Sequence, residues 1–288
     1  MYRERSLTPT WQPVLLPSLS LPRLGPRPFD KPAILMRVML GLFLATTIFA
    51  FFDFDYQNID LVQASLDTVA NFRTLLWAPQ LSHFSILAAF HGILVTLSLA
   101  FLTTVIGSGI ALIFGLMAAQ NLSTPLISST IKGAVAFVRA VPTILWVLFF
   151  AVSAGLGSVA AVVGMTFHSA GYLIKAYSEA FEEVDKGVIE ALAASGASWW
   201  QIVVQAVLPS SASYLMSWTF MRFEINFAVA VAVGAAAGAG GIGFDLFLAG
   251  AQYFDLREVG FITYLVLGVA VLLETITSKV KLGLRVNT

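Results

Sequence analysis

The stretch Ile86–Ala118 reads ILAAFHGILVTLSLAFLTTVIGSGIALIFGLMA and contains no Asp, Glu, Lys or Arg. A helix needs about 20 apolar residues to cross the hydrocarbon core of a bilayer, so this run is long enough to span it and to tilt or extend beyond it. Backbone polar groups must be paired in hydrocarbon, and a continuous apolar run favours a helix over the alternating pattern of a barrel strand. The stretch predicts an all-α, polytopic membrane protein.

The composition of the whole chain supports this class. Hydrophobic residues make up 58% of the 288 positions and charged residues 11%, which is more apolar than the average soluble domain. The formal net charge is zero, so no basic surface for nucleic acid is indicated. Because the chain has no cysteine, it has neither a disulfide nor a thiolate metal site.

Six apolar stretches are predicted to be transmembrane helices. A polar turn is expected at Gln120–Pro125, and the acidic segment over residues 53–85 is expected to be weakly structured. The predicted spans are Ala33–Phe52, Ile86–Ala118, Gly133–Ala154, Ser158–Ala180, Ser210–Ala235 and Phe261–Ser278.

The positions of Lys and Arg predict the orientation, because cationic flanks stay on the cytosolic side. If the N-terminus is cytosolic, most of the 16 Lys and Arg residues lie at cytosolic ends, and only Arg73 and Arg257 fall outside. Residues 1–32, polar and without the apolar core of a signal peptide, are expected to be a cytosolic N-terminal tail. Residues 279–288 are expected to be a cytosolic C-terminal tail.

Several motifs are absent from the sequence. It has no G-x-x-x-x-G-K-[ST] phosphate loop, so energy for uphill work would have to come from a partner or an ion gradient. His83, His91 and His168 lack the spacing of metal ligands, and a structural role is expected for each. No catalytic set is found, so we expect no enzyme activity, no cofactor and no metal.

A polar insert interrupts the apolar pattern at Glu190–Pro209, which reads EALAASGASWWQIVVQAVLP. Its beginning, Glu190–Ala194, favours a helix, Gly196 permits a turn, and Ala197–Gln205 can resume a helix. Pro209 fits the first turn of the next span. The pattern alone is equally compatible with an ordinary amphipathic connector.

The spacing of the insert resembles the signature of permease subunits of bacterial ABC importers, which is E-A-A, three residues, G, nine residues, I, one residue, L-P. Leu192 and Ala206 depart from it by apolar exchanges. The matching positions are Glu190, Ala191, Gly196, Leu208 and Pro209.

Other segments extend the resemblance. HSAGYLIKAYSEAFEEVD at 168–185, MRFEIN at 221–226 and GAGGIG at 238–243 resemble the permease subunit of phosphonate ABC transporters, over roughly residues 84–278. The resemblance implies a type I ABC importer permease fold in a bacterial inner membrane. It divides the chain into a first transmembrane helix with a periplasmic segment (33–85) and an importer transmembrane domain (86–278).

The resemblance also implies partners. In that family a second permease copy, a pair of cytosolic ATPase subunits and a periplasmic phosphonate-type binding protein complete the transporter, with the lipid bilayer around it. The coupling loop would be residues 181–209, whose helix at about 188–199 would dock in a cleft of the ATPase. Glu190 would start that helix, Gly196 would let the ATPase backbone approach, and Leu208–Pro209 would fix the exit into the fifth span.

Ionisable residues within the spans are candidate pathway residues. A charge at the bilayer centre costs about 3 kcal/mol or more, so it usually faces protein or a water-filled path. Arg139, Arg222 and Glu224 are such residues, and Arg222 and Glu224 point to different faces of a helix. One interpretation is that they form structural ion pairs between helices, such as Arg139 with Glu224. The other is an arginine that faces the pathway and attracts an anion, because guanidinium suits phosphonate or phosphate oxygens.

Glycine is concentrated after the fifth span. Gly238, Gly240, Gly241 and Gly243 indicate a tight re-entrant turn at the outer end of that span, with a weak anion nest as the alternative. In the resembling family this segment lies on the external side, which suggests an outer gate.

The function expected from the sequence is that of a permease subunit which imports phosphonate or a related phosphorus oxyanion by alternating access. One alternative is a permease of the same class for another small solute, because a fold does not encode its substrate. Another is an ion-coupled secondary transporter, for which the insert would have no purpose.

Overall fold

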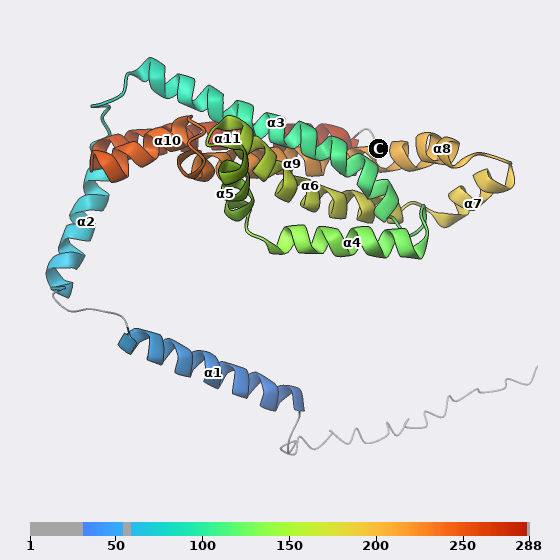
Figure 1. Ribbon diagram of the computed structural model, residues 1–288, viewed down its shortest axis with the longest axis horizontal. Coiled ribbons are helices and arrows are strands. Elements are labelled where there is room, and N and C mark those ends of the chain that lie inside the picture. Colours follow the sequence, from blue (N-terminus) through green and yellow to red (C-terminus); the bar gives the residue numbers. More distant parts are fainter. Residues whose placement is uncertain (1–30, 54–58, 287–288) are drawn as a thin grey trace, which may run out of the picture. The chain divides into compact units, whose positions relative to one another are not determined.

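The computed structural model describes residues 31–53 and 59–286, and every regular element in these ranges is a helix (Figure 1). Residues 1–61 and 62–288 form two separate units. The first unit contains α1 (Lys31–Asp53), an apolar helix with no buried residue that confirms the first predicted span. Most of the expected N-terminal tail lies outside the described residues.

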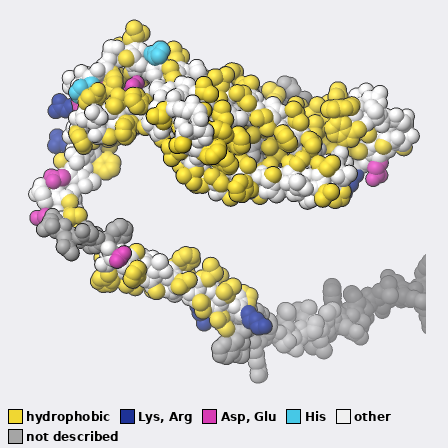
Figure 2. All heavy atoms as spheres, viewed as in Figure 1, with side chains coloured by type: hydrophobic (Ala, Val, Ile, Leu, Met, Phe, Trp, Pro, Cys, Tyr) yellow, Lys and Arg dark blue, Asp and Glu magenta, His cyan; other side chains and the backbone are white. Residues whose placement is uncertain are grey.

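Hydrophobic side chains cover most of the visible face of the second unit, and charged side chains gather near its ends (Figure 2). Its central helices are α3 (Ile86–Ala118), α6 (Ser158–Glu182) and α9 (Leu208–Ala236). Helices α3 and α6 pack along each other, and α9 packs against both. Gly115 permits this approach, because a Cβ added there would lie 3.0 Å from the Cβ of Tyr177.

The third predicted span, Gly133–Ala154, is not one straight helix. It consists of the end of α4 (Pro125–Ala140) and α5 (Thr143–Ala154), which meet at an angle of 87°. Pro142 causes the break, because proline disfavours the helical conformation of the residue before it, and Val141 is extended. If the bent pair crosses as one unit, the described residues contain six spans, and otherwise five.

Helices α9 and α11 (Leu256–Val286) contain the fifth and sixth predicted spans and confirm them. Two short elements, α10 and η2, fold back against the neighbouring helices α9, α3 and α11. The short elements are α7 (Lys186–Ala194), α8 (Trp199–Ile202), the π-helical turn η1 (Val203–Val207), α10 (Ile242–Phe247) and the π-helical turn η2 (Leu248–Gln252). Because α11 continues to Val286, most of the expected C-terminal tail is helical.

The segment over residues 53–85 differs from the expectation of weak structure. It contains α2 (Leu61–Trp77), a 17-residue helix. Its sequence, LVQASLDTVANFRTLLW, has polar residues but neither Gly nor Pro, so nothing in it breaks a helix. The Tyr264 hydroxyl of α11 donates to the Leu76 carbonyl at 2.8 Å, which attaches the end of α2 to the bundle.

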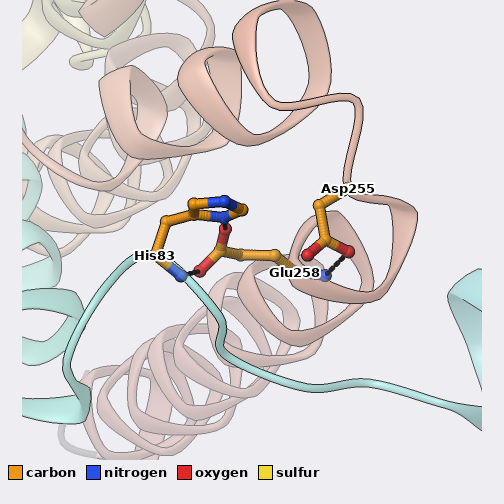
Figure 3. A group of neighbouring side chains, drawn as sticks. All are labelled: His83, Asp255 and Glu258. Carbon is orange, nitrogen blue, oxygen red and sulfur yellow. Dashed lines mark hydrogen bonds and ion pairs between the residues drawn. The ribbon is translucent and has the colours of Figure 1, made fainter.

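A buried carboxylate joins the chain ahead of α3 to the start of α11 (Figure 3). Glu258 is fully buried, and its Oε1 accepts the backbone N–H groups of Ser82, His83 and Phe84 at 3.0, 2.9 and 3.2 Å. Its Oε2 lies 2.8 Å from His83 Nδ1, and the His83 ring stacks on Tyr253. His83 therefore has the structural role expected of it.

Asp255 completes this group. Its Oδ1 accepts the backbone N–H groups of Arg257 and Glu258 at 3.0 and 3.3 Å, which caps the start of α11. The Ser82 hydroxyl and these two N–H groups hold the pKa of Asp255 below its usual value. His83, Asp255 and Glu258 could each offer a ligand atom to a cation, with these atoms within 4.8 Å of one another. Both Glu258 oxygens, however, already accept hydrogen bonds from the chain.

Replacing Glu258 should weaken the bundle more than replacing an exposed glutamate of the same helix. Glu258→Ala leaves three backbone N–H groups without their acceptor, so we expect a loss of about 3 kcal/mol in stability. Glu274→Ala, at an exposed position of α11, is the control. The midpoint of thermal unfolding is measured for both variants, purified in detergent. Equal midpoints would show that the hydrogen bonds to Glu258 do not stabilise the bundle.

Candidate functional site

A cavity of about 430 Å³ lies between α4, α6 and α9, and we call it the arginine cavity. Two of the three predicted pathway residues, Arg139 and Arg222, line it, and Glu224 does not. The polar and aromatic side chains that line it are Arg139, Thr143, His168, Tyr172, Lys175, Glu179, Trp218 and Arg222.

One face of α6 supplies much of this lining. His168, Tyr172, Lys175 and Glu179 follow one another at alternating steps of four and three residues, the spacing that places side chains on one face of a helix. From the sequence, this run only contributes to a resemblance, and it predicts no place for Tyr172 or Lys175 in a binding site. The signal that could have found them is this period of polar residues within an apolar span.

Arg222 is held in place by a buried polar network. The side chain is only 6% exposed, and its Nε donates to Ser169 Oγ of α6 at 3.1 Å. Asn226, one turn further along α9, donates to the same hydroxyl at 3.0 Å and to Thr104 Oγ1 of α3 at 2.9 Å. Because three helices contribute to this network, the position of the guanidinium is fixed by the packing of the bundle.

The two guanidinium groups share one aromatic ring. Cζ of Arg139 lies 4.4 Å from the centroid of the Tyr172 ring, and Cζ of Arg222 lies 4.9 Å from it. The ring partly offsets the repulsion between the two cations. Arg139 Nε and His168 Nδ1 are both buried, and neither atom has a hydrogen-bond partner among the described residues, so both could take part in binding a ligand.

The structure does not contain the Arg139–Glu224 ion pair that one interpretation of the sequence suggested. Neither arginine takes part in any ion pair among residues 31–53 and 59–286. Arg139 lies in the last turn of α4, just before the Pro142 break, and its guanidinium lies over the Tyr172 ring. Glu224 lies on another face of α9, and its buried Oε1 has no hydrogen-bond partner among the described residues. Glu179 is the one carboxylate among the described residues that line the cavity, and its Oε1 lies 3.5 Å from Lys175 Nζ.

The predicted coupling segment is built differently from the expectation of one helix over 188–199. Helix α7 begins at Lys186 after the cap Asp185, so Glu190 is inside the helix and does not start it. Gly196 has φ +87° and ends the helix, with its N–H bonded to Ala193 O and the next N–H bonded to Leu192 O. This is a Schellman motif, in which the left-handed residue that ends the helix is usually glycine.

The C-terminal end of the predicted coupling segment continues into α9 without a loop. Leu208 and Pro209 begin α9 directly after the π-helical turn η1, which widens the helix ahead of a proline that has no N–H to donate. Trp199 Nε1 donates to Leu122 O at 2.8 Å, which ties α8 to the turn between α3 and α4. Glu190, Ala191 and Gly196 are exposed. We call the turn at 119–124 and the segment at 183–198 the loop end of the bundle.

The predicted glycine turn is present. Gly238, Gly240 and Gly241 have φ of 59°, 74° and 77°, in the left-handed region that favours glycine. Ile242 N donates to Thr96 Oγ1 of α3 at 3.1 Å, and a Cβ at Gly243 would overlap the backbone of α9. The four glycines therefore allow α10 to fold back, and a gating role for them stays a prediction.

The apolar helices, the cavity within the bundle and the exposed loop at one end define a multi-pass membrane transport protein. Residues 111–283 match the family model described as binding-protein-dependent transport system inner membrane component. The chain belongs to this family, which places it among membrane transport components rather than enzymes.

Relatives with assigned substrates share part of the sequence. The chain is 31% identical to phosphate-import permease protein PhnE of Mycolicibacterium smegmatis, over 53% of this chain and 29% of that protein. It is 28% identical to phosphite transport system permease protein PtxC of Stutzerimonas stutzeri, over 62% of this chain and 66% of that protein. The chain thus spans less than two thirds of either relative.

A solved structure shows the same fold. A chain of the MetNI methionine ABC transporter in an inward-facing conformation aligns with a TM-score of 0.64 and 23% identity, over 71% of this chain and 99% of that chain. The fold is that of a type I ABC importer permease.

The Tyr172 ring should stabilise the two neighbouring cations. Tyr172→Leu removes the ring, so we expect a loss of about 1–2 kcal/mol in stability, from two cation–π contacts. Tyr172→Phe keeps the ring and should unfold at the wild-type temperature in detergent. If the leucine variant also unfolds at that temperature, the ring does not offset the repulsion between the arginines.

Proposed function

We propose that the chain is the permease subunit of an ATP-driven importer that carries phosphonate or a related phosphorus oxyanion. The observation that carries this proposal is the pair Arg139 and Arg222, which line one cavity and have no carboxylate partner among the described residues. A guanidinium offers a fork of donors that matches phosphorus oxyanions. The names of two relatives, a phosphate-import and a phosphite transport permease, point to the same chemistry.

The rest of the transporter follows from this proposal. The loop end would face the cytosol and dock a pair of ABC ATPase subunits through residues 181–209, with both termini on the same side. A periplasmic phosphonate-type binding protein would deliver the anion at the opposite end, near Gly238–Gly243, and a second copy of the chain would complete the pathway. In this arrangement 33–85 is the first span with a periplasmic segment, and 86–278 is the transport domain.

The contacts at the loop end suggest how force would enter the bundle. An ATPase that moves α7 and α8 would also move the turn at 119–124, because Trp199 donates to Leu122 O. The widened turn η1 leads from α8 into α9 without a loop, so the same motion reaches the helix that carries Arg222. Such a lever needs rigid connections and no reactive group.

Removing a cavity arginine should strongly reduce transport. Arg222→Gln and Arg139→Gln should each reduce uptake of labelled phosphate, phosphite or methylphosphonate by at least about tenfold, because each removes a charge-assisted contact. Arg73→Gln, at an exposed position of α2, is the control. Uptake is measured in a strain that lacks other transporters for these anions. If wild type carries none of the three, the substrate class is wrong, and if both variants transport normally, the cavity is not on the pathway.

The ATPase contact can be tested at Gly196. A Cβ at this position would meet no atom of the chain within 4 Å, so an added side chain points into open space at the loop end. Gly196→Asp should leave membrane insertion intact, since aspartate tolerates the left-handed conformation better than most residues, and should prevent copurification with the ATPase. A variant that still copurifies with the ATPase and transports would count against docking at this loop.

A further inference from the structure

A second cavity, of about 260 Å³, shares part of its wall with the arginine cavity. Arg139, Lys175 and Glu179 line both cavities. The second cavity adds Lys132 of α4 and Glu182 of α6, and we call it the lysine cavity. Because three charged residues are shared, an ion in the arginine cavity has the lysine cavity as its neighbour.

The lysine cavity lies closer to the loop end. Lys132 precedes Arg139 on α4 by about two helical turns, or about 10 Å along the axis. Glu182 is the last residue of α6 and continues the stripe of Tyr172, Lys175 and Glu179 on one face of that helix. The cations of the two cavities thus follow one another from Arg222 within the bundle to Lys132 near its end.

The two cavities differ in how their cations are paired. Neither arginine has a carboxylate partner, whereas Lys132 Nζ lies 2.7 Å from Glu182 Oε1 and Lys175 Nζ lies 3.5 Å from Glu179 Oε1. The arginines are fixed, Arg222 by Ser169 and both by the Tyr172 ring. The lysine side chains are 37% and 51% exposed, and lysine has a flexible stem.

An anion therefore meets strong sites first and weaker sites afterwards. An unpaired guanidinium attracts an oxyanion without competition from a carboxylate. At a lysine, the oxyanion must compete with the glutamate that is paired with that lysine. When the anion leaves, the carboxylate returns to the lysine, so no bare charge remains to draw the anion back. Such an order of affinities favours movement toward the loop end.

We propose that Lys175 and Lys132 form a second, inner anion site, at which Glu179 and Glu182 act as exchangeable counter-ions that make the release of the transported oxyanion fast. This inference rests on the proposed function, because it assumes that an anion occupies the arginine cavity. The competing explanation is that both ion pairs only stabilise the ends of α4 and α6.

The test uses Lys132→Gln, Lys175→Gln, Glu182→Gln and the Lys132→Gln/Glu182→Gln double variant in the complete transporter. The amide oxygen in Glu182→Gln can still accept the backbone N–H of Gln120, which donates to Glu182 Oε1 at 2.8 Å, so the α3–α4 turn stays attached. Lys279→Gln, at an exposed position of α11 outside both cavities, is the control. The readouts are the maximal rate and half-saturation concentration of uptake, with phosphate, phosphite or methylphosphonate, whichever wild type carries fastest. The third readout is the equilibrium binding of the same labelled anion to the purified transporter.

We expect Lys132→Gln, and likewise Lys175→Gln, to lower the maximal uptake rate about fivefold with the half-saturation concentration unchanged. Glu182→Gln leaves Lys132 without its competitor, so it should increase the affinity for the labelled anion about fivefold and also slow uptake, because release is slower. In the double variant the increase in affinity for the labelled anion should disappear, because Lys132 is no longer present to bind it. A purely structural ion pair predicts instead that Glu182→Gln lowers thermal stability and does not increase anion binding, and that result would overturn the inner site.

Arg222→Gln and Arg139→Gln, measured in parallel, separate the two proposals. If Arg222→Gln and Arg139→Gln both retain uptake, the arginine cavity is not the pathway and the proposed function fails at that site. If either loses uptake while the Lys132 and Glu182 variants match wild type in rate and in anion binding, the proposed function stands and the inner site is refuted.

Discussion

A polypeptide in hydrocarbon must satisfy its own backbone hydrogen bonds, and this constraint shapes the whole described chain. It makes the spans helical, and it limits where a helix can break. The breaks in the bundle occur where protein supplies replacement partners. At the glycine turn, for example, Thr96 Oγ1 accepts the Ile242 N–H. At the start of α11, Asp255 accepts amides of the first helical turn, and Glu258 accepts amides of the chain ahead of α3. Irregular backbone is therefore concentrated beside cavities and at the ends of the bundle.

The same constraint explains how charges are distributed. A buried guanidinium needs partners, and Arg222 finds them in a hydroxyl and an aromatic ring and not in a carboxylate. This arrangement leaves its positive charge unneutralised within the bundle, which an ion pair would not. Toward the loop end, where side chains are more exposed, Lys132 and Lys175 are each paired with a glutamate. The gradient from unpaired to paired cations is the electrostatic basis of both proposals.

Particular residues show how far the sequence could predict the site. Arg139 and Arg222 stand out as charges in apolar runs, and both line the arginine cavity. Tyr172 and Lys175 could have been found from their spacing with His168 and Glu179, because a helix places such residues on one face. The pairing of Arg139 with Glu224 was wrong, since opposite charges in two spans suggest a pair without showing which way each side chain points. The polar residues ahead of α3 suggest weak structure, but none of the residues of α2 breaks a helix, so a helix forms there.

By itself the sequence determined the class of protein, the positions of the long apolar helices and the chemistry of the residues that lie within them. These follow from local physics, because the cost of apolar surface in water and of unpaired amides in lipid depends on the residues of one segment. Only the tertiary structure decided that Arg139, Tyr172 and Arg222, from three different helices, meet around one cavity. Their meeting depends on the depth and rotation of each helix, which are set by close contacts between distant segments. At Gly164, for instance, a Cβ would lie 2.5 Å from the backbone of Val147, so α5 can approach α6 only because that side chain is absent.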